Sequence, residues 1–156
     1  MKSLFAIRAE KAIADSGHWK TGKMPSSAFP LSKSASYRLT GQWQWRVLRL
    51  SAHDRAFRLL VAFDAAKRQY QAWLGVEFGN DQALIARIEF HASHHGWHCH
   101  WKCGNLDDVS RGVVKARSAQ ERLRLCPKPK DFDQSNALAI AFRAFNVATK
   151  TDGALL

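Results

Sequence analysis

Alternation of apolar and polar residues runs through the middle of the chain and restricts its fold more than any other feature. It is clearest over residues 70–78, where every second residue from Tyr70 to Phe78 is apolar. Because side chains alternate between the two faces of a strand, this period predicts strands with one face in a core. The expected strands lie at about 43–51, 57–64, 69–78, 83–92 and 97–103. Their short connections predict an antiparallel meander.

Loop lengths predict the register of the last three strands, because one face of each must stay apolar. A three-residue loop at 79–81 and a four-residue loop at 93–96 satisfy that condition. On the apolar face the expected pairs are Val76 with Leu84, Leu74 with Ala86 and Ala72 with Ile88. On the other face they are Trp73 with Arg87, Gln71 with Glu89, His91 with His98, Glu89 with His100 and Arg87 with Lys102. The last pair is unfavourable unless an anion or acid lies between the two cations.

Other segments flank the sheet region. Residues 3–15 predict a short amphipathic helix that stops near Gly17. Residues 17–40, rich in Gly, Ser, Pro and Lys, predict a basic arm or surface loop. Asp133 is a suitable N-cap for a helix at about 134–149, which is apolar around much of its circumference. We expect this helix to cover the aromatic face of the sheet.

These patterns together predict the fold class. A chain of 156 residues is normally one domain, and we expect residues 1–156 to form one. The predicted class is α+β. A sheet of about five antiparallel strands spans residues 41–104, with one face covered by the C-terminal helix and a short N-terminal helix beside it.

The charge of the chain indicates its partners. It has 24 Lys+Arg against 13 Asp+Glu, a formal net charge of +11. Such an excess favours polyanionic partners, and with six Trp present, nucleic acid (DNA or RNA) is the leading candidate. Lys20 and Lys23 would then lie along a phosphate backbone, although a plain surface connection is the simpler explanation of the arm.

Cysteine count and hydropathy indicate the compartment. Three cysteines, an odd number, do not make a disulfide framework. No apolar run has the length of a signal-peptide core or a membrane span. We therefore expect a cytoplasmic location and no membrane partner.

Five of the seven histidines lie between Glu89 and Cys103. From Trp97 onward, the histidines alternate with tryptophan and cysteine, so a strand there has an aromatic, thiol-lined core face and a polar face. The predicted open face carries Trp73, Glu77, Arg87, Glu89, His91, His98, His100 and Lys102.

A divalent-metal site is the first interpretation of this face. His91, His98 and His100 supply three nitrogen ligands for zinc or manganese, and Glu89 can serve as a fourth ligand, a partner of a ligand or a general base. Alternative donors are His94, His95, Cys99 and Cys103, of which the two cysteines are expected to point into the core.

The segment His98-Cys99-His100 resembles the His-hydrophobic-His strand of the HUH endonucleases. His91 lies seven positions before His98, a spacing similar to the three-histidine motif of conjugative relaxases. The resemblance implies single-strand nicking or replication-initiation chemistry, with a divalent ion on these three histidines and a tyrosine that attacks the DNA phosphate. The chain has only Tyr37 and Tyr70, both before the histidines, and Tyr70 is expected to face the core.

Two further interpretations need no metal. In a ribonuclease of the toxin or defence type, one group takes the 2′-hydroxyl proton, an imidazole protonates the leaving oxygen and a cation stabilises the phosphorane. The catalytic candidates are Glu89, His91, His98, His100 and Lys102. In a protein that only binds DNA or RNA, aromatic rings stack on bases and cations neutralise phosphates. The candidate contacts are Trp73, Arg87, Lys102, Lys20 and Lys23.

Overall fold

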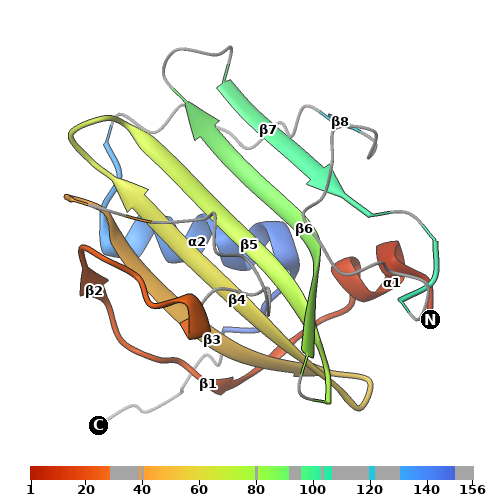
Figure 1. Ribbon diagram of the computed structural model, residues 1–156. Coiled ribbons are helices and arrows are strands. Elements are labelled where there is room, and N and C mark those ends of the chain that lie inside the picture. Colours follow the sequence, from red (N-terminus) through yellow and green to blue (C-terminus); the bar gives the residue numbers. More distant parts are fainter. Residues whose placement is uncertain are drawn as a thin grey trace, which may run out of the picture.

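An antiparallel sheet with a helix against one face forms the fold of the chain (Figure 1). The computed structural model describes residues 1–28, 39, 41–79, 81–91, 96–102, 104–106, 120–121 and 131–149. Its long strands follow one another in chain order: β3 (Gln44–Ala52), β4 (Arg55–Asp64), β5 (Gln69–Phe78), β6 (Asp81–His91) and β7 (Gly96–Trp101). The predicted α+β class and the antiparallel meander are confirmed.

Short strands extend the meander at both edges. β1 (Ala12–Asp15) and β2 (Lys20–Thr21) both pair with β3, and β8 (Gln120–Glu121) pairs with β7. None of them was predicted, because segments of two to four residues are too short to show a period of two.

The N-terminal helix is shorter than predicted. α1 spans Ser3–Arg8, and Ala9 then adopts an extended backbone with φ −57° and ψ 142°. Residues 12–15, predicted to continue the helix, form β1. Gly17 is not a helix stop; it lies with φ +56° after β1, where a Cβ atom would collide with the carbonyl oxygen of Val47. Glycine is therefore required there by the close approach of the chain to β3.

The C-terminal helix begins where predicted. α2 spans Gln134–Phe145, and the Asp133 side chain accepts a hydrogen bond of 2.8 Å from the backbone N–H of Asn136. It ends earlier than residue 149, because Asn146 adopts the left-handed conformation with φ 51°. In the part of the chain that the structure describes, no helix is long and apolar enough to cross a membrane.

The main core lies between α2 and the sheet, as predicted. Figure 1 shows α2 behind the sheet, running across its strands. Ala137, Ala141 and Phe145 of α2 are buried against the apolar residues of β3 to β7. The Tyr70 hydroxyl, buried beneath the helix, donates a 2.9 Å hydrogen bond to the carbonyl oxygen of Ala137. The packed aromatic rings are Tyr70, Phe90, Trp97 and Phe132.

The second face of the sheet, predicted to be open, is partly covered by the arm. Met24 and Leu39 are buried there against a second apolar cluster. Its sheet members are Trp45, Leu60, Ala62, Trp73 and Leu84. The rest of the predicted arm, residues 29–38 and 40, lies outside the described residues.

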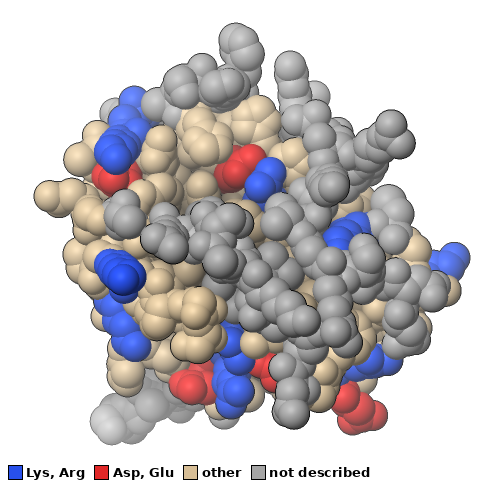
Figure 2. Space-filling model, viewed as in Figure 1, with Lys and Arg blue, Asp and Glu red and all other residues tan. Residues whose placement is uncertain are grey.

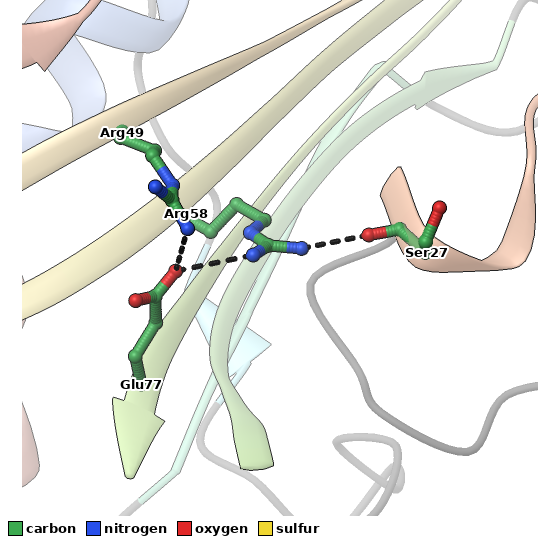
Figure 3. A network of polar contacts seen from close by, with 4 residues as sticks. All are labelled: Ser27, Arg49, Arg58 and Glu77. Atoms are coloured by element: carbon green, nitrogen blue, oxygen red, sulfur yellow. Dashed lines mark hydrogen bonds and ion pairs between the residues drawn. The ribbon is translucent and has the colours of Figure 1, made fainter. Parts of the chain in front are cut away.

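A polar network fixes this cover to the sheet (Figure 3). Arg58 of β4 donates a 2.8 Å hydrogen bond to the carbonyl oxygen of Ser27, in the short helix η1 (Ser26–Ala28) of the arm. Its Nη2 lies 3.2 Å from Glu77 Oε1, and Arg49 Nη2 lies 4.0 Å from the same oxygen. Glu77 therefore lies on the predicted face but is engaged by two arginines.

The register between β5 and β6 agrees with prediction only in part. Leu74 pairs with Ala86, but Gly75, not Val76, pairs with Leu84, so a β-bulge leaves Ile85 as the extra residue. Both Ile85 and Ala86 then face the main core, while Leu84 joins the cluster on the second face. The bulge lets four consecutive apolar residues be buried on two faces.

The predicted register between β6 and β7 is wrong by two residues. Phe90 pairs with Trp97, so Glu89 lies opposite His98 and Arg87 opposite His100. The Phe90 and Trp97 rings pack with centroids 5.2 Å apart. This register also replaces the expected pairing of Arg87 with a lysine by a pairing with histidine. A shift of two leaves every side chain on its predicted face and changes only its neighbours.

Lys11 is a buried cation that joins the ends of the two helices. Its Nζ donates hydrogen bonds to the carbonyl oxygens of Ile7 at 2.8 Å, Ala9 at 2.8 Å and Phe145 at 2.9 Å. The residue is 0 % exposed. Burial lowers the pKa of its amine from 10.5 to about 8. Carbonyls at a helix C-terminus lack partners in the helix and attract a cation, which explains the location of this charge.

Candidate functional site

Five ionisable side chains gather on the second face of the sheet, beyond the described part of the arm. Arg87, Glu89 and His91 alternate along β6, and His98 and His100 alternate along β7. We call these five residues the polar cluster. The side chains of four of them are between 11 % and 27 % exposed. The two strands therefore hold them in a partly dehydrated environment.

Glu89 is the centre of the polar cluster. Its Oε1 lies 3.2 Å from Nη2 of Arg87 and 3.6 Å from Nε2 of His100. Its Oε2 lies 3.6 Å from Nε2 of His91. His98 is directly opposite Glu89 in the strand pair, and the His91 and His98 rings have centroids 6.4 Å apart. One carboxylate thus faces a guanidinium and two imidazoles, with a third imidazole across the strand.

Burial lowers the pKa of His100 below its ordinary value of 6.5, and the Arg87 charge acts in the same direction. The carboxylate of Glu89 opposes this shift. His100 is therefore a neutral imidazole at pH 7. Burial also lowers the pKa of Lys102, which follows β7 and whose backbone N–H bonds the Ile85 carbonyl at 2.8 Å.

Two polar atoms of the polar cluster lack a hydrogen-bond partner among the described residues. Arg87 Nε and His100 Nδ1 are buried and have no hydrogen-bond partner in the part of the chain that the structure describes. The two residues are directly paired across β6 and β7. Since buried polar groups nearly always have partners, this pair has hydrogen-bonding capacity to spare.

Trp73 borders the polar cluster but is not an open stacking platform. It is 3 % exposed and belongs to the second apolar cluster. The Arg87 guanidinium lies 5.1 Å from its ring centroid, a cation–π contact. Its indole N–H bonds Oε1 of Gln71 at 3.1 Å. Gln71 was not among the predicted site residues, although its predicted position opposite Glu89 was a signal for it.

The arm lysines lie apart from the polar cluster. Lys20 and Lys23 are exposed, and Lys20 lies 5.3 Å from the ring centroid of Trp45. Strand β2 pairs with β3, so β4 and β5 separate these lysines from β6 and β7. Figure 2 shows the described Lys and Arg side chains dispersed over this face, with acidic side chains beside some of them. The described basic residues in this view do not form a single patch.

The predicted metal ligands His91, His98 and His100 share one face of the sheet. Within the described ranges, no group of three His, Cys, Asp or Glu side chains is arranged to hold a metal ion. Cys99 is buried in the main core, on the opposite side of the sheet, as expected. His94, His95 and Cys103 lie outside the described residues.

Neither predicted tyrosine is seen beside the histidines. Tyr70 is buried under α2, and its burial raises the pKa of its phenol well above 10. It is therefore not placed to attack a phosphate at the polar cluster. Tyr37 lies outside the described residues.

Comparisons with protein-family models, with curated proteins and with solved structures gave no match to this chain.

Proposed function

We propose that the polar cluster binds RNA and cleaves its phosphodiester bonds by metal-independent acid–base catalysis. The observation that carries the proposal is the Glu89 carboxylate, which lies 3.2–3.6 Å from one guanidinium and two imidazoles on a single sheet face. With His98 directly across the strand pair, this face holds a base, an acid and an anion-stabilising cation. These are the groups that RNA cleavage through attack by the 2′-hydroxyl requires.

Four residues of the polar cluster, together with Lys102, have stated roles in this proposal. Glu89 accepts the proton of the 2′-hydroxyl group while the 2′-oxygen of the RNA attacks the phosphorus atom. His98, across the strand pair from Glu89, donates a proton to the 5′-oxygen as the P–O bond breaks, leaving a 2′,3′-cyclic phosphate. Arg87 and Lys102 stabilise the negative charge on the phosphoryl oxygens. Neutral His100 positions the phosphate with its ring nitrogen.

The charge of the chain supports a polyanionic substrate. A formal net charge of +11 attracts RNA from solution. Arg87 Nε and His100 Nδ1, which have no hydrogen-bond partner among the described residues, supply additional hydrogen-bonding capacity beside Glu89. Binding of this kind weakens steeply as salt is raised, whether or not cleavage follows.

The test compares three oligonucleotides of one sequence in EDTA: RNA, 2′-O-methyl RNA and DNA. We expect cleavage of the RNA alone, with cyclic phosphate ends. Glu89→Gln and His98→Gln should each slow cleavage roughly 100-fold or more. Matched controls are Glu77→Gln, on the same face but outside the polar cluster, and His18→Gln, an exposed histidine. Both should cleave at the wild-type rate.

Other outcomes separate the remaining hypotheses. Cleavage of single-stranded DNA that requires manganese or zinc would refute the proposal and favour the HUH-type prediction, with His91, His98 and His100 as ligands. Salt-sensitive binding without cleavage, unchanged in Glu89→Gln, would refute catalysis and leave a DNA- or RNA-binding protein.

A further inference from the structure

A cavity of about 110 Å³ lies on the other face of the sheet from the polar cluster. It is lined by α1, by the C-terminal end of α2 and by the core face of β6 and β7. Figure 1 shows α1 at the side of the sheet, near the lower part of β6 and one end of α2. No step of the proposed RNA cleavage uses this cavity.

Small side chains create the cavity. Ala86 of β6 and Ala144 of α2 line it, while larger apolar residues such as Ile88 and Trp101 form the neighbouring wall. A longer side chain at residue 144 would occupy the space. Leu4 also lines the cavity and is 38 % exposed. The cavity therefore reaches the surface beside α1.

Among the described residues that line the cavity, Arg8 is the only charged one. It is exposed at the last turn of α1 and forms no ion pair with any residue in the described ranges. A guanidinium offers parallel N–H donors that match a carboxylate. The remaining lining is apolar apart from the Cys99 thiol.

We propose that this cavity binds a small apolar carboxylic acid, with its apolar part between α1 and the sheet and its carboxylate on Arg8. The size follows from the volume, because an apolar cavity of about 150 Å³ is enough for benzene. A cavity slightly smaller but open at Leu4 takes a ring or short chain whose charged end remains at the mouth. Benzoate and hexanoate have these dimensions.

Benzoate is the probe, and benzamide is its uncharged counterpart of nearly the same shape. The indole N–H signal of Trp101, assigned with Trp101→Phe, reports binding in ¹H–¹⁵N spectra of the full chain. We expect benzoate to shift this signal in a saturable way. Benzamide should bind at least about tenfold more weakly, because it cannot form the charge-assisted pair.

Two variants with matched controls locate the site. Arg8→Met should weaken benzoate about tenfold or more and leave benzamide unchanged. Arg143→Met, which removes an exposed arginine from the last turn of α2, should change neither. Ala144→Leu should abolish both interactions by filling the cavity, whereas Ala139→Leu, at an exposed position of the same helix, should not.

Three results would overturn the proposal. One is the absence of saturable benzoate shifts at Trp101. A second is equal binding of benzoate to wild type and Arg8→Met, which would assign the cavity to uncharged ligands. The third is a concentration-dependent dimer that Ala144→Leu disrupts while benzoate has no effect, which would assign the cavity to a second copy of the chain. The Arg8→Met measurement tests whether the cavity binds the carboxylate even if Ala144→Leu does not fold.

Discussion

Replacement of Lys11 by methionine tests how the two helices are joined to each other. Methionine keeps much of the length of the lysine stem but has no donor. The change removes three hydrogen bonds, of 2.8, 2.8 and 2.9 Å, from carbonyl oxygens at the ends of α1 and α2. At a net of about 1–1.5 kcal/mol for each bond, Lys11→Met should lower the free energy of unfolding by about 3–5 kcal/mol.

The effect should grow with pH, and the sign follows from the pKa of the amine. The folded-state pKa of about 8 lies below the ordinary value of 10.5 for a lysine amine. Between these two values the unfolded chain holds a proton that the folded chain has lost, so folding of the wild type gains stability as pH rises. The full gain is at most about 3 kcal/mol, and Lys11→Met should lack it.

The assay is urea unfolding followed by tryptophan fluorescence at several pH values between 7 and 10.5. The urea concentration at the midpoint of unfolding should be lower in the variant. The dependence of the free energy of unfolding on urea concentration should stay constant. Lys67→Met is the control, because Lys67 has a side chain 67 % exposed, and its loss should change stability by less than about 0.5 kcal/mol. A difference between wild type and Lys11→Met below about 1 kcal/mol would refute the role of the three bonds. A pH-independent difference would refute the assigned pKa.

Two further predictions concern other parts of the fold. Asp133→Ala removes the N-cap of α2 and should cost about 1 kcal/mol, measured as a lower urea midpoint; an unchanged midpoint would mean that the capping bond adds nothing. His100 should titrate below pH 6.5 in ¹H–¹⁵N spectra of its ring, because burial disfavours the imidazolium; titration above 6.5 would mean that the attraction of Glu89 outweighs burial.

Several features of the fold could be predicted because they depend on neighbours in the sequence. The strand expected at 69–78 is found as Gln69–Phe78, where alternation is unbroken. The Asp133 cap was predictable because the side chain bonds a backbone group only three residues away. Such short-range patterns can be recognised in the sequence without knowledge of the tertiary structure.

The register of β6 could not be predicted from the same pattern. Residues 83–86 are all apolar, so alternation does not reveal a bulge within them. The structure places the extra residue at Ile85, where burial on both faces of the sheet satisfies every apolar side chain. Likewise, the period of two permits a slip of two residues between β6 and β7, and the observed register is one in which Phe90 packs on Trp97.

The sequence by itself determined which side chains share a face. Arg87, Glu89, His91, His98 and His100 lie together because strand periodicity is local. Only the tertiary structure decided that Glu89 is opposite His98 and that Trp73 is buried. The physical reason is that pairing and burial depend on distant parts of the chain, such as Met24 and Leu39, whose positions no local period encodes.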